Sequence, residues 1–205
     1  MMPLPDSMWI DEQPLVLASK SAVRSAVLSA CKIPHVVCPA DIDEREIENH
    51  ADDPTDIAIH LAKAKAVAVS GVYPGHIVVG ADQTCTLANV PVHKARTIEE
   101  LRLQLRQMRG KIHVLTSAAA IARDGRVLGS CRSSAHMEMI DFSDDFLENY
   151  LKIGGKGLLE SVGGYQIEGL GVTLMQSITG DIHTVMGLPL IDLLHELRRL
   201  GVLQR

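Results

Sequence analysis

The sequence predicts an α/β fold built on a mixed β-sheet. Through the first half of the chain, short apolar runs alternate with segments of helical periodicity, which is typical of strands and helices in alternation. Two long extended stretches follow, 111–123 and 126–140, and they flank Asp124-Gly125, a dipeptide that favours a tight hairpin turn. Alternating elements followed by an antiparallel hairpin indicate a sheet with both kinds of strand pairing.

The composition fits a globular protein with a sizeable core. The chain has 205 residues, of which 46% are hydrophobic and 22% are charged, enough for one domain or two closely joined lobes. No internal repeat or low-complexity segment interrupts it. We therefore take residues 1–14 as a loose lead-in and residues 15–205 as a single α/β domain.

Charge and cysteine usage narrow the functional classes. The formal net charge is −5, whereas a protein that binds nucleic acid through broad phosphate contacts is usually basic. No apolar stretch approaches the length that spans a bilayer, and Met1–Gln13 lacks the basic and apolar regions of a signal peptide. None of the four cysteines forms a CxxC pair, which fits a reducing compartment. We expect a cytoplasmic protein without nucleic-acid or membrane partners.

Strand and helix signals locate the elements of the first half. The predicted elements are strands over 15–18, 35–39 and 77–79 and helices over 22–31 and 54–70. The second helix has Asp53 as its N-cap, Pro54 at its first position and Gly71 at its end. Its expected apolar face consists of Ile57, Leu61, Ala64 and Ala68.

Capping signals locate the later elements. Thr97 and Glu100 match a capping box, and Ser143 is a candidate N-cap. Besides the hairpin, the predicted elements are a helix from Thr97 to Gly110, a helix from Ser143 to about Ile153, an irregular glycine-rich segment over 154–171, a strand over 172–178 and a helix from Leu188-Pro189 to Gly201.

A candidate anion site lies where the first strand meets its helix. Ser19 and Ser21 offer hydroxyls there, and the first backbone N–H groups of a helix have no partner within it. Arg24 could add a forked, charge-assisted contact to a phosphate. A plain N-cap with a surface arginine explains the same residues, and the spacing alone favours that interpretation.

Two further groups could serve a phosphate substrate. Asp41-Ile42-Asp43-Glu44 carries oxygen ligands of the kind that suit Mg²⁺ or Mn²⁺, or is a solvated acidic loop. Lys63 and Lys65 lie on different faces of the alanine-rich helix, so that one could reach a binding site while the other is solvated.

Asp82 is the candidate catalytic carboxylate. It follows the apolar strand 77–79, and ligand sites in α/β sheets lie outside the carboxyl ends of strands. A carboxylate there can activate water or hold a metal, or it can simply form a turn. We interpret nearby Cys85 as a core residue rather than a nucleophile. Of the nine histidines, His35, His60, His113 and His183 are interpreted as structural or exposed, with no metal role.

In chain order, seven short motifs resemble those of the Maf family. They are LASKSAVR (17–24), DIDE (41–44), LAKAKA (61–66), VVGADQTC (78–85), HK (93–94), GGYQIEGLG (163–171) and VMGLPL (185–190). The resemblance spans the chain from about Leu15 to Gly201. Each motif is short, but their common order makes the set specific.

The resemblance implies a Maf/ITPase-like fold of two lobes around a cleft. It also implies hydrolysis of a nucleoside triphosphate to a monophosphate and diphosphate with a divalent cation, Mg²⁺ or Mn²⁺, and a homodimer. The roles implied residue by residue are proton acceptor for Asp82, phosphate binding for Ser19, Ser21, Arg24, Lys65 and Lys94, and proximity to the metal for Glu44.

Three positions bear on the substrate. One branch of the family resembles dTTP/UTP pyrophosphatases and another resembles 7-methyl-GTP pyrophosphatases. Val23, Gln83 and Glu168 match the second branch. A carboxylate such as Glu168 can accept hydrogen bonds from guanine N–H groups and favours the positive charge of the methylated base. The alternatives are a dTTP/UTP enzyme and a non-catalytic nucleotide-binding regulator of cell division (septum formation).

Overall fold

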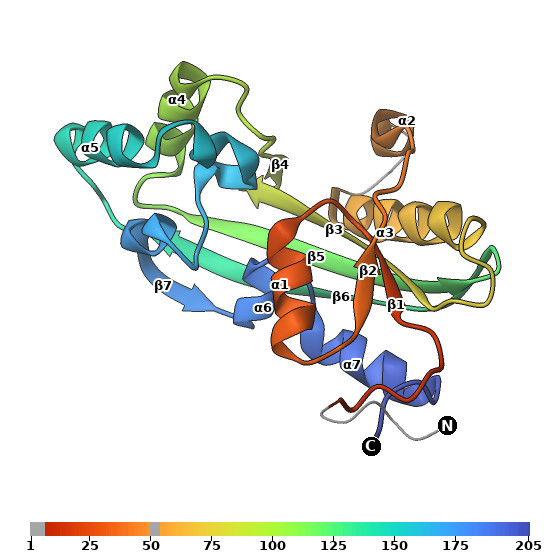
Figure 1. The fold of residues 1–205 in the computed structure, drawn as a ribbon. Coiled ribbons are helices and arrows are strands. Elements are labelled where there is room, and N and C mark those ends of the chain that lie inside the picture. The colour runs from red at the N-terminus through yellow and green to blue at the C-terminus, as the bar shows by residue number, and fades with distance from the viewer. Residues whose placement is uncertain (1–6, 50–53) are drawn as a thin grey trace. The chain divides into compact units, whose positions relative to one another are not determined.

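The computed structural model describes residues 7–49 and 54–205. Its sheet has seven strands, in the order β2-β1-β3-β5-β6-β7 with β4 paired to β3 (Figure 1). β1 runs parallel to β2 and β3, whereas β4 is antiparallel to β3 and β7 is antiparallel to β6. The predicted mixed α/β sheet is therefore confirmed.

The elements have the following bounds. The strands are β1 (Leu15–Ala18), β2 (His35–Val37), β3 (Val78–Leu87), β4 (Val90–Pro91), β5 (Ile112–Arg123), β6 (Arg126–Met139) and β7 (Met175–Thr179). The α-helices are α1 (Ala22–Ala30), α2 (Glu44–Asn49), α3 (Pro54–Ser70), α4 (Ile98–Met108), α5 (Asp144–Gly154), α6 (Ile182–Val185) and α7 (Leu190–Arg199). Three short 3₁₀ helices lie between α5 and β7: η1 (Gly155–Glu160), η2 (Val162–Gly164) and η3 (Leu170–Leu174).

The chain forms two compact units. The first unit comprises residues 1–83, 117–133 and 187–205, and the second comprises 84–116 and 134–186. The first therefore holds β1, β2, α1, α2, α3 and α7, and the second holds α4 and α5 with the 3₁₀ helices. β3, β5 and β6 each pass from one unit into the other.

The predicted lead-in is anchored at Trp9, although Met8, Ile10, Glu12 and Gln13 are exposed. The Trp9 side chain is only 2% exposed, and its indole N–H donates to the Gln13 carbonyl oxygen at 2.9 Å. Trp9 also forms a β-bridge with Leu203, and the Ile10 N–H donates to the Val202 carbonyl. This partner lies near the other end of the chain, so no local pattern reveals it.

Local capping signals are confirmed where the structure describes them. The hydroxyls of the predicted N-caps Thr97 and Ser143 accept hydrogen bonds from the backbone of α4 and α5, and the Ser21 hydroxyl does the same for α1. α3 begins at Pro54 as expected, and its predicted cap Asp53 lies outside the described residues. The hairpin turn is confirmed as well, because Asp124 and Gly125 both have positive φ, as a type I′ turn requires.

Three elements differ from the sequence-based expectation. β3 continues to Leu87, so Asp82 lies inside a strand rather than in a turn after it. β7 begins at Met175, because the residues before it form η3. α2 was not predicted, since it is short and strongly acidic and lacks an apolar face.

The buried face of α3 is only partly the predicted one, since Leu61 is buried as expected but Ile57 is only half-buried. Ala64 is half-buried and Ala68 is exposed, whereas Ala58, Ala62 and Ala66 are fully buried. These three alanines pack against Ala118, Ala120 and Ala122 of β5. A helix made largely of alanine has little hydrophobic contrast around its axis, so periodicity does not identify its buried side.

α3 approaches the sheet so closely that β3 requires a glycine. A Cβ at Gly80 would lie 2.2 Å from the Ala62 carbonyl oxygen and 2.6 Å from the Ala66 nitrogen. Both are backbone atoms that no side-chain rotation can move. The small residues on both sides thus set the distance between α3 and β3.

The second unit has its own hydrophobic core. Its buried side chains come mainly from α4, α5, β6 and the glycine-rich segment, with Leu101, Leu105, Met137, Leu147 and Tyr150 among them.

Among residues 7–49 and 54–205, no helix is both long enough and apolar enough to cross a membrane.

Replacing Gly80 by alanine should destabilise the protein. The added methyl must displace the α3 backbone, and overpacking of this kind costs about 1–3 kcal/mol of the free energy of unfolding. Urea denaturation measures it. Gly71→Ala is the control at the end of the same helix, because its nearest neighbour, the Ala68 carbonyl oxygen, would be 3.6 Å from the new Cβ. Equal midpoints for the two variants would contradict the close packing of α3 on β3.

Candidate active site

The strand order places a candidate site at the carboxyl end of β1. In the order β2-β1-β3, the connection through α1 leads from β1 to its neighbour β2. The connection through α3 then leads in the opposite direction, from β2 to β3 on the other side of β1. Because parallel crossovers are right-handed, helices on connections of opposite direction cover opposite faces of the sheet, as α1 and α3 do in Figure 1. Ligands of α/β proteins bind in the crevice outside the strand ends at such a switch point.

Ser19, Ser21 and Arg24 follow β1 and are linked by hydrogen bonds. The Ser19 hydroxyl accepts from the Arg24 Nη1 at 3.0 Å and from the Ser21 backbone N–H at 3.3 Å. The Ser21 hydroxyl accepts from the Arg24 backbone N–H at 3.3 Å and so caps α1. The predicted anion-binding segment is therefore an ordered loop on a helix N-terminus, which orients backbone N–H groups outward.

Arg24 joins three segments of the first unit. Its Nη1 also donates to the Ala81 carbonyl oxygen on β3, and its Nε donates to the Gly187 carbonyl oxygen, both at 2.7 Å. Gly187 has a φ of 91°, and a Cβ there would come within 3.3 Å of Arg24 Nε, so glycine permits the approach. The guanidinium is thus held in one orientation before any ligand arrives.

The remaining donors of Arg24 suit an anion. Among the described residues its Nη2 has no hydrogen-bond partner, which leaves two N–H groups for a phosphate. Burial lowers the pKa of the Arg24 guanidinium, and the carboxylates of Asp82 and Glu44 oppose that shift. An arginine stays charged at neutral pH despite such burial.

Lys65, Asp82 and Glu44 form a compact charged cluster. Lys65 Nζ lies 2.6 Å from Asp82 Oδ1 and 2.8 Å from Glu44 Oε1. The side chains of Lys65 and Asp82 are only 11% and 14% exposed, whereas that of Glu44 is 52% exposed. The two carboxylates therefore converge on one ammonium group at the margin of the site.

The contact between α3 and the sheet brings these charges together. Lys65 immediately precedes Ala66, which packs on the backbone at Gly80, and Asp82 lies two residues beyond Gly80 on the same face of β3. Lys65 is the buried lysine of its helix and Lys63 is half-buried, in line with the prediction that only one of them reaches a site.

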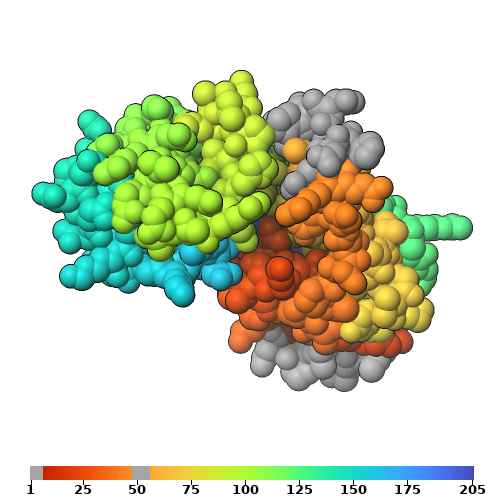
Figure 2. Space-filling view, turned by 90° about the horizontal axis from the view of Figure 1, so that it is seen from above, coloured from red at the N-terminus to blue at the C-terminus, as the bar shows by residue number. Residues whose placement is uncertain are grey.

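Gln83 lies on the opposite face of β3 from Asp82, because side chains alternate along a strand. Its Nε2 donates to the Ser117 hydroxyl of β5 at 3.1 Å. This face of the sheet is the one that α1 covers, and α1 carries the half-buried Val23. Figure 2 shows the residues around α1 (red to orange) on the same face of the first unit as those leading to α2 (orange).

The other two predicted site residues belong to the second unit. Lys94 is exposed in the segment between β4 and α4, and Glu168 is exposed in the turn before η3. The loop that carries Glu168 is anchored by Tyr165, whose hydroxyl lies 2.6 Å from Nε2 of the fully buried His113. Burial lowers the pKa of His113 to about 4, so this structural histidine is neutral at physiological pH.

The prediction for Cys85 can also be checked directly. Cys85 is buried, and burial raises the pKa of its thiol to about 12, which confirms a core residue rather than a nucleophile. Sequence reasoning missed Ser117 and the carbonyl groups of Ala81 and Gly187. The only signals for Gly187 and Ala81 were their places in the VMGLPL and VVGADQTC motifs, and nothing local marked Ser117.

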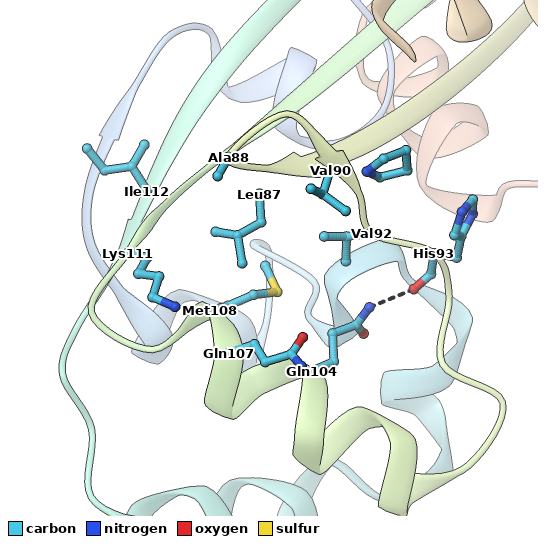
Figure 3. A pocket seen from close by; sticks show the side chains of 11 residues that line it. Leu87, Ala88, Val90, Val92, His93, Gln104, Gln107, Met108, Lys111 and Ile112 are labelled. Atoms are coloured by element: carbon cyan, nitrogen blue, oxygen red, sulfur yellow. Dashed lines mark hydrogen bonds between the residues drawn. The ribbon is translucent and has the colours of Figure 1, made fainter. Parts of the chain in front are cut away.

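The second unit also contains a pocket of about 610 Å³. Figure 3 shows its apolar lining, including Leu87, Val92 and Met108, with Lys111 at one side. Gln104 Nε2 is bonded to the His93 carbonyl there. None of the residues that line the pocket is a predicted site residue.

In residues 7–49 and 54–205, the His, Cys, Asp and Glu side chains do not gather in any group of three that could hold a metal ion.

Comparison with known proteins finds relatives along most of the chain. A "7-methyl-GTP pyrophosphatase" of Brucella suis is 47% identical over 90% of this chain and 95% of that protein. A "Nucleoside triphosphate pyrophosphatase" of Rhodopseudomonas palustris is 42% identical over 94% of this chain and 96% of that protein. A solved Ham1 protein from Coxiella burnetii has a TM-score of 0.43 at 14% identity, covering 63% of this chain and 74% of that chain.

The family model described as "Maf-like protein" matches residues 14–200. The matched range includes every residue that the sequence predicts for the site. It also begins and ends within one residue of the region over which the motifs resemble that family. With a family model covering most of the chain and relatives above 40% identity, this protein belongs to the Maf-like protein family.

Proposed function

We propose that this protein hydrolyses 7-methyl-GTP to the nucleoside monophosphate and diphosphate. Its activity is that of a nucleoside triphosphate pyrophosphatase, a hydrolase acting on acid anhydrides, because relatives at 42–47% identity along most of the chain carry that name. The observation that supports the chemistry best is the convergence of Glu44 and Asp82 on Lys65, beside Arg24 at the end of β1.

The reaction needs positioning and charge neutralisation more than covalent chemistry. The oxygen of a water molecule forms a bond to the α-phosphorus, while the bond from that phosphorus to the oxygen that bridges it to the β-phosphorus breaks. The diphosphate leaves with the bridging oxygen. Negative charge develops on the phosphoryl oxygens and the leaving group. Preorganised cations stabilise that charge most when the site excludes water.

Asp82 is the proposed proton acceptor. Lys65 holds its Oδ1 at 2.6 Å, and Oδ2 has no partner among the described residues, so that Oδ2 can accept a hydrogen bond from water. Lys65 thus fixes the orientation of the carboxylate through Oδ1 and leaves Oδ2 for the water molecule. The water's proton passes to Asp82 as the oxygen attacks.

Arg24 is the proposed phosphate clamp. The two N–H groups of Nη2 would bind phosphate oxygens while Nε and Nη1 stay bonded to the protein. Backbone N–H groups at the start of α1, with the hydroxyls of Ser19 and Ser21, would add donors for the same group. The exposed ammonium group of Lys94 is a further proposed contact to the phosphates.

A divalent cation, Mg²⁺ or Mn²⁺, fits this set of residues. Two carboxylates, Glu44 and Asp82, already converge, and Mg²⁺ is commonly held by one or two carboxylates together with substrate phosphates. The two carboxylates also cancel the charges of Arg24 and Lys65, so these side chains alone bring no net positive charge to a triphosphate. When bound, the cation would supply that charge and polarise phosphoryl oxygens.

Recognition of the base is assigned to Val23, Gln83 and Glu168. The Glu168 carboxylate is exposed and can accept hydrogen bonds from the N–H groups of guanine. A 7-methylated guanine is positively charged, so a carboxylate favours it over unmodified guanine. The Brucella suis protein at 47% identity, named for 7-methyl-GTP, supports this choice over UTP.

A panel of nucleotides tests the substrate. We expect kcat/KM to be highest for 7-methyl-GTP among 7-methyl-GTP, GTP, UTP and dTTP, with monophosphate and diphosphate as products. The assay follows diphosphate release with Mg²⁺, with Mn²⁺ and with EDTA, and EDTA should abolish turnover. Preference for UTP over 7-methyl-GTP would contradict the substrate, and full activity in EDTA would contradict the metal.

Replacing Asp82 by asparagine tests the proton acceptor. The amide keeps the shape of the side chain but cannot take the proton, so kcat should fall by about 10²–10⁴. Asp145→Asn is the control, because Asp145 is an exposed carboxylate on α5. If Asp82→Asn hydrolyses every nucleotide as fast as the wild type, Asp82 is not the base.

A pair of lysine variants tests the charged cluster. Lys65→Met leaves Asp82 and Glu44 without their shared ammonium group, so kcat/KM should fall by about 10²-fold, as when a preorganised donor is lost. Lys63→Met removes a lysine from the same helix that contacts neither carboxylate, and its kcat/KM should stay near that of the wild type. Similar losses in both variants would show that only the helix surface charge matters.

A further inference from the structure

The Ser117 side chain bonds to the carboxamide of a proposed specificity residue. Ser117 is fully buried on β5, and its hydroxyl accepts from Gln83 Nε2 at 3.1 Å. Gln83 itself is half-buried, on the strand beside β5. A buried hydroxyl on a strand that packs against α3 has little freedom to move, so it offers Gln83 a fixed partner.

The orientation of a carboxamide decides what a nucleobase meets. One side of the group is a carbonyl that accepts hydrogen bonds, and the other is an NH₂ that donates them. Turning the group over exchanges the two. Guanine presents N–H donors and a carbonyl on its Watson–Crick edge, whereas uracil presents one N–H between two carbonyls, so a fixed carboxamide distinguishes between them.

The two neighbours Asp82 and Gln83 are each fixed from a different element. Lys65 of α3 holds the Asp82 carboxylate on one face of β3, and Ser117 of β5 holds the Gln83 carboxamide on the other. A single stretch of β3 thus carries a catalytic group and a recognition group with separate supports. A change at Ser117 should therefore alter recognition without altering the chemical step.

We propose that Ser117 is a positioning residue for substrate selectivity, acting through Gln83. The proposal rests on the proposed function, since it takes the base-recognition role of Gln83 as given. Ser117 holds the carboxamide so that its orientation toward the base stays constant. The energy gained is that of one neutral hydrogen bond, which corresponds to roughly 3- to 10-fold in selectivity.

The test is the ratio of kcat/KM for 7-methyl-GTP to that for UTP, measured for the wild type, Ser117→Ala, Gln83→Ala and the double variant. Ser117→Ala should lower the ratio roughly 3- to 10-fold, mainly through KM for 7-methyl-GTP with kcat preserved. In the Gln83→Ala background the same change should have no further effect. Thermal unfolding of the wild type and the three variants checks that each protein is folded.

Thr116→Val is the matched control. Thr116 is the preceding residue of β5, and its hydroxyl pairs with Ser134 at 2.9 Å rather than with Gln83. Removing this hydroxyl should leave the ratio within about twofold of the wild type, as expected of a buried hydrogen bond that contacts no site residue.

Two results would overturn the proposal. In one, Ser117→Ala keeps the wild-type ratio although Gln83→Ala changes it. In the other, Ser117→Ala lowers the ratio equally with and without Gln83, so that it acts by another route. Failure of the proposed function would give a different result, because the wild type would then prefer UTP over 7-methyl-GTP. The coupling between Ser117 and Gln83 would still be measurable from the same ratio of kcat/KM values.

Discussion

The close contact of α3 with β3 and β5 is the constraint on which the candidate site depends. Ala62 and Ala66 meet the sheet where Gly80 has no side chain, and the alanines of β5 complete the contact. Any larger residue at this contact would push the helix away from the strand. Lys65 reaches Asp82 only because the helix lies this near, so packing of small residues sets the geometry of the charges.

This geometry explains why a buried lysine is tolerated. An ammonium group taken out of water costs several kcal/mol unless it is paired, and Lys65 has two carboxylates as partners. Arg24 is half-buried, and three protein acceptors bind its Nε and Nη1 groups. In the proposed enzyme the charges are thus held in place by the fold itself, and little reorganisation is needed when a triphosphate binds.

β3 organises the site because its side chains alternate. Asp82 faces the helix that carries Lys65, and Gln83 faces the side of α1, which carries Val23 and Arg24. The proposed chemistry and the proposed recognition of the base therefore start from adjacent residues with different supports. The Ser117 hydroxyl holds the Gln83 side chain by a hydrogen bond, as the Lys65 ammonium group holds the Asp82 carboxylate.

The sequence by itself determined the local structure and the family. The caps Thr97 and Ser143 and the Asp124-Gly125 turn depend on residues close together in the chain, so they can be read without the fold. The motifs and their order are properties of the sequence alone. Tertiary structure alone decided the buried face of α3, the place of Asp82 within β3, the packing of Trp9 and the partners of Arg24 and Gln83. The physical reason is that an alanine-rich helix carries little periodic contrast, and that contacts such as Arg24 with Gly187 join residues 163 positions apart.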